Sequence, residues 1–146
     1  LFLGFTFNYG LLVGWVSVQE NLTLIPIIFY IGAIFWTLGY DTIYGLQDMR
    51  DDEIIGVKST SIKFKNNPKA FVGSCYCLCV LFILIMFLMM EANKYILFFS
   101  IPFITSLFYQ IRIFDIKNSK SCLTAFRFNN FSGFLIFIFI FLINIL

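Results

Sequence analysis

The chain has 146 residues, of which 60% are hydrophobic, 21% aromatic and only 12% charged. An ordinary soluble domain has ~25% charged residues, and one of this size cannot hide so much apolar surface in a single core. The formal net charge is +2 and there is no histidine, so any proton or metal chemistry falls to carboxylates, tyrosines, lysines and water. The composition predicts an integral membrane protein.

Five uncharged apolar stretches follow one another, each close to the ~20 residues that a bilayer-spanning helix needs. They are Leu1–Val18, Leu24–Tyr40, Ala70–Met90, Tyr95–Ile111 and Phe131–Leu146. The predicted fold class is therefore all-α, a polytopic transmembrane bundle of about five spans forming a single domain over residues 1–146. The chain starts at Leu1 without a Met or the features of a signal peptide, so we expect it to be incomplete at the N-terminus.

The cysteines of the third stretch lack the spacing of a zinc site. Cys75, Cys77 and Cys79 have no partner histidine, and we interpret them as small hydrophobic residues of a membrane helix.

The basic residues predict the orientation of the spans. Nine of the ten lysines and arginines fall within two segments, Asp41–Lys69 and Arg112–Asn130. These are alternate connections, so they lie on one side of the membrane, and the positive-inside rule makes that side cytoplasmic. We expect a bacterial inner (cytoplasmic) membrane protein with its Asp-rich loop in the cytoplasm. For a eukaryotic source, the mitochondrial inner membrane would be the equivalent.

Five of the eight acidic residues lie in the run YDTIYGLQDMRDDE. If the second span continues through this run as a helix, one face carries residues at offsets of 3, 7, 10 and 11. These residues are Asp41, Tyr44, Asp48, Asp51 and Asp52. Like charges four residues apart, such as Asp48 and Asp52, repel each other. Oxygen-only ligands suit a hard cation, first of all Mg²⁺, which typically binds one or two carboxylates together with substrate phosphates.

Cations and hydroxyls follow the acidic run. Arg50 and Lys58 are placed to contact phosphate oxygens, and Ser59 and Thr60 add hydroxyl donors. A nucleotide-binding loop is excluded because Val57 separates the glycine from the lysine and the first glycine is missing. The pattern predicts half of a metal–diphosphate site; the alternative is a solvated loop of mixed charge.

The longer run YDTIYGLQDMRDDEIIGVKSTSIKF resembles the second Asp-rich motif of the UbiA superfamily of intramembrane prenyltransferases, specifically its 4-hydroxybenzoate polyprenyltransferases. The stretches LGFTFNYGLLVGW and CLTAFRFNN agree with the same subfamily. The resemblance implies the C-terminal portion of a nine-helix bundle in which two Asp-rich loops face each other.

The resemblance also implies the roles of single residues. The implied metal ligands are the pair Asp48 and Asp52, with Asp51 and Asp41 in addition. Lys58 would steady the diphosphate, aided by Arg50 and Ser59. Tyr44 would contact the diphosphate or the aromatic acceptor.

The implied reaction is the Mg²⁺-dependent transfer of a polyprenyl group from polyprenyl diphosphate to the ring of 4-hydroxybenzoate, a step of ubiquinone biosynthesis. The expected partners are these two substrates and membrane lipid. Nucleic acid is not expected as a partner. The family's first motif, N-D-x-x-D-x-x-x-D, is absent, because no acids follow Asn129 and Asn130. We therefore expect the missing N-terminal half of the enzyme as a partner and no activity from this chain alone.

Three alternatives stay open from the sequence. One keeps the superfamily but changes the acceptor to a haem, a chlorophyll precursor or a naphthoate. Another is a transporter or channel segment, although that function predicts acidic residues inside the spans. The third is a non-catalytic assembly protein.

Overall fold

The computed structural model describes residues 2–90 and 95–143, apart from the side chains of residues 50, 95–97, 99 and 143. The part described is helical and contains no β-strand, which confirms the all-α prediction. The helices are α1 (Phe2–Gln19), α2 (Leu24–Gly45), α3 (Met49–Ile55), α4 (Thr60–Lys63), α5 (Pro68–Met89), α6 (Tyr95–Ile113) and α7 (Ser119–Ile143).

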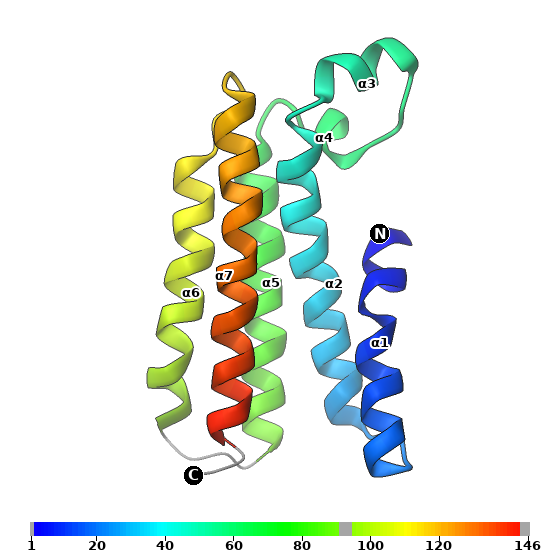
Figure 1. Cartoon of the computed structure of the whole chain (residues 1–146), viewed down its shortest axis with the longest axis vertical. Coiled ribbons are helices and arrows are strands. Elements are labelled where there is room, and N and C mark those ends of the chain that lie inside the picture. Colours follow the sequence, from blue (N-terminus) through cyan, green and yellow to red (C-terminus); the bar gives the residue numbers. More distant parts are fainter. Residues whose placement is uncertain (1, 91–94, 144–146) are drawn as a thin grey trace.

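The five long helices run side by side along one axis (Figure 1). Helix α2 packs against α1, α5 and α7, while α6 packs against α7 and α5. The short helices α3 and α4 form a cap at one end of the bundle, between α2 and α5 in the chain (Figure 1). The turn between α6 and α7 lies at this same end, so the two basic connections share one end of the bundle, as the sequence predicts.

All five predicted spans coincide with helices, and α2, α5 and α7 are long and apolar enough to cross a membrane by length and composition. Helix α2 continues past the apolar stretch that ends at Tyr40 and reaches Gly45, so it enters the acidic run. Helix α7 begins at Ser119, twelve residues before the apolar stretch that starts at Phe131. The α7 extension is polar overall, but Cys122 and Ala125 give it a buried stripe at helical spacing. Leu1 and residues 144–146 of the predicted spans are outside the described residues.

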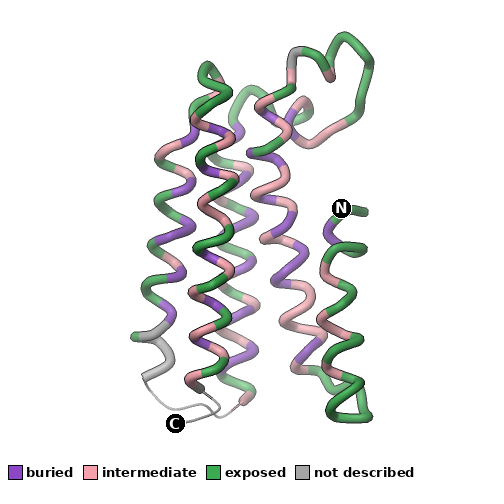
Figure 2. Tube along the Cα trace, in the orientation of Figure 1, coloured by how far each residue is buried: buried purple, intermediate pink, exposed green. Residues whose placement is uncertain are grey.

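The core lies between α2, α5, α6 and α7, where the buried positions of each helix face inward (Figure 2). Cys75 and Cys79 are buried in it, as expected of small hydrophobic residues, whereas Cys77 is exposed on the outer face of α5. The ring of Tyr76 on α5 packs directly on the backbone of α2 at Gly39, where a Cβ would collide with it. Glycine at this position therefore leaves room for the ring between the two helices.

A hydrogen-bonded polar network joins α5, α6 and α7 inside the core. The Tyr76 hydroxyl donates to Gln110 Oε1 at 2.7 Å, and Gln110 Nε2 donates to Ser132 Oγ at 2.8 Å. Ser106 Oγ also donates to Ser132 Oγ, at 2.9 Å. All four side chains are buried. Because lipid supplies no hydrogen-bond partners, buried polar groups of a membrane bundle must satisfy one another, as these do.

Candidate metal–diphosphate site

The acidic run does not form one continuous helix, so that part of the prediction is wrong. Helix α2 ends at Gly45, and Asp48 precedes the first residue of α3 with φ −108° and ψ 13°. The physical reason is the packing of α4 across the end of α2. A Cβ on Gly45 would lie 2.6 Å from Ser61 Oγ, and the hydroxyls of Thr42 and Thr60 are 2.8 Å apart. The chain therefore turns back over α2 at this point.

The turn gathers most of the predicted residues around one cavity of about 450 Å³. Asp48 and Asp52 lie one helical turn apart, since Asp52 N donates to the Asp48 carbonyl oxygen at 3.0 Å. The cavity is lined by Leu3, Leu38, Asp41, Tyr44, Gly45, Asp48, Asp52, Lys58, Ser59, Thr60 and Ser61. It thus joins the end of α2, the start of α3 and the segment before α4, with one residue from α1.

Two of the predicted site residues are not placed there. Asp51 lies exposed on α3 and is not among the residues that line the cavity. Because α2 ends at Gly45 and α3 starts in a new direction, the neighbouring acidic residues Asp51 and Asp52 of α3 point to different sides. Asp52 faces the cavity, and Asp51 does not. The side chain of Arg50 lies outside the described residues.

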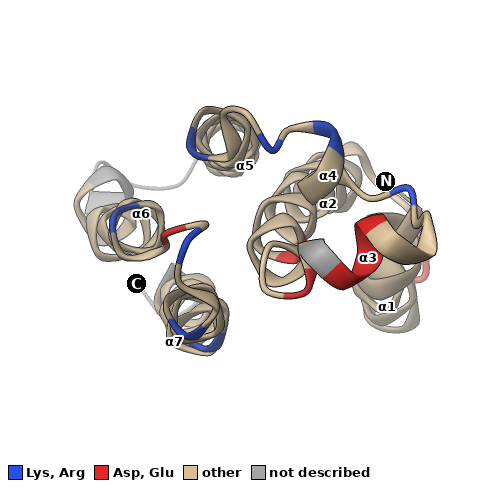
Figure 3. Cartoon of the chain, turned by 90° about the horizontal axis from the view of Figure 1, so that it is seen from above, with Lys and Arg blue, Asp and Glu red and all other residues tan. Residues whose placement is uncertain are grey.

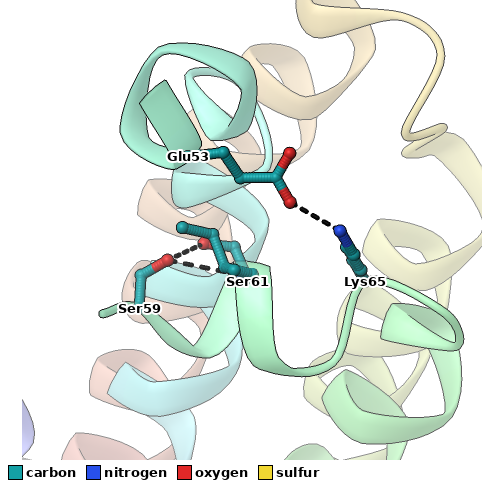
Figure 4. Close-up of polar contacts among 5 residues, drawn as sticks. Glu53, Ser59, Ser61 and Lys65 are labelled. Atoms are coloured by element: carbon teal, nitrogen blue, oxygen red, sulfur yellow. Dashed lines mark hydrogen bonds and ion pairs between the residues drawn. The ribbon is translucent and has the colours of Figure 1, made fainter. Parts of the chain in front are cut away.

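The segment that carries Lys58 and Ser59 is held by short polar contacts (Figure 4). Ser59 Oγ accepts a hydrogen bond from Ile62 N at 3.3 Å and lies 2.8 Å from Ser61 Oγ. Lys65 Nζ and Glu53 Oε1 form an ion pair at 2.7 Å that ties α3 to the chain after α4. Both of these side chains are more than a third exposed, so the pair contributes to local geometry more than to stability.

The carboxylates of the cavity are left largely unneutralised. Asp41 and Asp52 have neither a hydrogen bond to the carboxylate nor an ion pair within the described part of the chain, and Asp48 has only a 3.5 Å contact from Gln47 Nε2. Acidic residues of α2 and α3 gather at the capped end, where basic residues also lie (Figure 3). Like charges that line one cavity repel one another, so a bound cation would stabilise this arrangement.

The donor set fits Mg²⁺, because carboxylate and hydroxyl oxygens are ligands of hard cations. Among the described residues, however, no three acidic or cysteine side chains are close enough to hold a metal ion by themselves. A metal ion at Asp48 and Asp52 would therefore need further oxygen ligands, such as substrate phosphates, which Mg²⁺ commonly uses.

One residue beside the site was missed by sequence reasoning. The ring of Phe126, on α7, lies 4.8 Å from that of Tyr44 and 6.0 Å from that of Tyr40, measured between centroids. Phe126 is distant from the acidic run in sequence, so periodicity could not place it there. The signal that could have found it is the stretch CLTAFRFNN, which agrees with the same subfamily as the acidic run.

Comparison with known proteins gives a consistent result along the chain. The sequence model of the UbiA prenyltransferase family matches residues 1–143. A 4-hydroxybenzoate octaprenyltransferase of Francisella tularensis subsp. mediasiatica (strain FSC147) is 34% identical over 140 residues, which are 94% of this chain and 49% of that protein. The corresponding protein of Francisella tularensis subsp. novicida (strain U112) is 33% identical over 140 residues, again 94% of this chain and 49% of that protein.

A more distant organism gives a similar match. A mitochondrial 4-hydroxybenzoate polyprenyltransferase of Aedes aegypti is 34% identical over 142 residues, covering 94% of this chain and 32% of that protein. No solved structure matches the chain. The chain spans about half the length of the Francisella relatives.

Proposed function

Because this chain belongs to the UbiA prenyltransferase family, we propose that it forms one half of the active site of an enzyme that prenylates 4-hydroxybenzoate. The donor is polyprenyl diphosphate and the reaction belongs to ubiquinone biosynthesis. The observation that carries the proposal is the single cavity shared by Asp48, Asp52, Lys58 and Ser59. The names of the relatives from Francisella and Aedes support the choice of acceptor.

The charges of the cavity suit the leaving group of this reaction. Asp48 and Asp52 would hold Mg²⁺, with Asp41 beside them, and the ion would supply positive charge to the diphosphate. Lys58 donates charge-assisted hydrogen bonds to phosphate oxygens, and Ser59 adds a hydroxyl donor. With its charge balanced in this way, the diphosphate departs as the allylic C–O bond breaks. The electron-rich acceptor ring then forms the new C–C bond and loses one proton.

The rest of the site is proposed to come from the part of the enzyme that this chain does not contain. The relatives are about twice as long, and the sequence holds one Asp-rich motif where the resemblance implies two. Residues 1–146 would then be the C-terminal portion of a single transmembrane domain. Prenyl transfer by this chain alone is not expected, because half of the metal ligands are absent from it.

The bundle end that carries α3 and α4 is proposed to face the cytoplasm. Both basic connections lie at this end (Figures 1 and 3), and the positive-inside rule assigns such an end to the cytoplasmic side. Lys94 is outside the described residues. A bacterial inner membrane is the location that fits this orientation and the relatives from Francisella.

A single-chain chimera tests the proposal. In it, this chain replaces the 140 matching residues of the Francisella octaprenyltransferase, and the host bacterium lacks its own enzyme and makes no ubiquinone. We expect the chimera to restore ubiquinone, and its membranes to convert 4-hydroxybenzoate and octaprenyl diphosphate only when Mg²⁺ is present. The chain expressed alone should do neither.

The outcomes separate the possible functions. A chimera that accepts a naphthoate but not 4-hydroxybenzoate would keep the chemistry and change the acceptor. A chimera that folds in the membrane and transfers no prenyl group to either acceptor would reject the proposal. Robust transfer by this chain alone would show that the family's first Asp-rich motif, which this chain lacks, is not needed.

A further inference from the structure

The stretch CLTAFRFNN of α7 has no part in the reaction as described so far, although it lies beside the cavity. Its buried residues fix the helix: Cys122 and Ala125 are fully buried, and Cys122 Sγ donates to the Asp115 carbonyl oxygen at 3.3 Å. Phe126 follows directly and extends towards α2, where its ring meets Tyr40 and Tyr44. The first turns of α7 are thus anchored in the core and present an aromatic ring to the end of α2.

The aromatic residues that Phe126 meets belong to one stripe of α2. Trp36, Tyr40 and Tyr44 recur every four residues and share a helix face. The rings of Trp36 and Tyr40 pack edge to face with centroids 6.4 Å apart. Trp36 also packs edge to face on Phe103 of α6, at 5.3 Å. The stripe therefore runs from the interior of the bundle to the cavity, and Tyr44 is its last ring.

The cavity consequently has two chemically different sides. The side formed by α3 and the segment before α4 carries Asp52, Lys58 and Ser59, which suit a charged diphosphate. The side formed by α2 carries Tyr44, backed by Phe126, with Asp41 close to one helical turn before it. Aromatic rings pack on one another in offset or edge-to-face geometry at centroid distances of ~4.5–7 Å, so this second side suits an aromatic substrate.

Tyr44 needs support to keep one orientation. Its side chain is 41% exposed, and an exposed tyrosine exchanges between rotamers readily. Phe126, at a centroid distance of 4.8 Å and an interplanar angle of 47°, restricts that motion from a helix that is itself fixed in the core. An acceptor ring must be aligned closely with the allylic carbon before reaction.

We propose that Phe126 is a positioning residue that holds the Tyr44 ring as the wall on which the aromatic acceptor binds. This inference rests on the proposed function, and it assigns the α7 motif to the recognition of the acceptor rather than of the donor. Phe126 acts through Tyr44 and so affects acceptor affinity, whereas Lys58 and Ser59 serve the diphosphate.

Phe128 provides a matched control on the same helix. It is also partly buried and also pairs with a tyrosine, Tyr109 of α6, at a centroid distance of 4.9 Å. Tyr109 does not line the cavity. Phe126→Leu and Phe128→Leu therefore remove equivalent aromatic pairs from α7, one beside the cavity and one away from it.

The test is steady-state kinetics of the chimera with each substrate varied in turn. We expect Phe126→Leu to raise the KM for 4-hydroxybenzoate about five-fold, the size of effect that one aromatic pair produces, with the KM for octaprenyl diphosphate unchanged. Phe126→Tyr should restore the wild-type value, because it keeps the ring. Phe128→Leu should leave both KM values unchanged.

A double substitution tests whether Phe126 acts through Tyr44. Tyr44→Leu should raise the acceptor KM by itself, and adding Phe126→Leu should then have no further effect. Independent, additive effects would overturn the inference, as would equal effects of Phe126→Leu and Phe128→Leu. A rise in the donor KM alone would also overturn it.

An unsubstituted chimera without transferase activity would overturn both this inference and the proposed function. In an active chimera, the contrary results described above would overturn only the inference.

Discussion

Two of the groups of polar side chains in this bundle differ in how their hydrogen-bonding capacity is used. In the core network, Tyr76, Gln110, Ser106 and Ser132 satisfy one another at 2.7–2.9 Å, shielded from solvent. In the cavity, the carboxylates of Asp41 and Asp52 have no such partners within the described residues. One group is closed, and the other is open towards a space that a ligand can fill.

The difference separates polar residues that hold the fold together from those that are available for chemistry. A closed network stabilises one arrangement of α5, α6 and α7, because any displacement leaves a buried group unpaired. The open group does the opposite, since like charges that share one cavity repel each other and favour a bound cation. Substitutions in the first group should therefore change stability, and those in the second should change activity.

The largest effect is expected from Asp48→Asn in the chimera. Loss of one charged group that helps to balance the leaving diphosphate should lower kcat/KM by about 100-fold or more. Glu53→Gln is the matched control, because Glu53 lies on α3, which Asp48 directly precedes, but outside the cavity, and it is paired with Lys65. Transfer assays at saturating Mg²⁺ measure the difference. Equal losses of kcat/KM in the two variants would mean that activity depends on the total negative charge of this region and not on a carboxylate inside the cavity.

A smaller effect is expected from Lys58→Met. A charge-assisted hydrogen bond to phosphate contributes roughly ten-fold in affinity, so the KM for octaprenyl diphosphate should rise by about that factor. Lys65→Met removes the same charge from a residue already paired with Glu53 and should have little effect on that KM. If Lys58→Met changed only the acceptor KM, the division of the cavity into two sides would be wrong.

In the core network, Gln110→Leu should destabilise the bundle without abolishing activity. It leaves the Tyr76 hydroxyl without its acceptor, and such a loss inside a membrane protein costs about 1 kcal/mol. The melting temperature in detergent should fall, while kcat at low temperature stays near that of the unsubstituted chimera. Ser74→Ala, which removes an exposed hydrogen bond within α5, should change neither quantity. A fall in kcat with no change in melting temperature would mean that the core network serves the reaction and not the stability of the fold.

The smallest effect is expected from Asp51→Asn. Asp51 is exposed and does not line the cavity, and exposed charges are screened by salt. Activity should fall by less than about three-fold. A loss as large as that of Asp48→Asn would favour the sequence-based assignment of Asp51 as a metal ligand over the geometry of the cavity.

The sequence predicted the helical bundle and most of the residues around the cavity, because hydropathy and charge are local signals. It placed Asp41, Tyr44, Asp48 and Asp52 on one side for a reason that proved wrong, since they are not on one continuous helix. The turn after Gly45 depends on contact with Ser61, and the role proposed for Phe126 depends on the packing of α7 against α2. Both are contacts between distant residues, which a single sequence does not display.

The close contact between Gly39 and Tyr76 also bears on how the protein is made. During synthesis α2 enters the membrane before α5 has been translated, so the surface around Gly39 first meets lipid. It becomes a helix–helix contact only when the ring of Tyr76 arrives. Because α4 packs on α2 and directly precedes α5 in the chain, we expect the cavity to take shape at that stage. The insertion of α5 would then be the step of biogenesis that completes the cavity for which diphosphate binding is proposed.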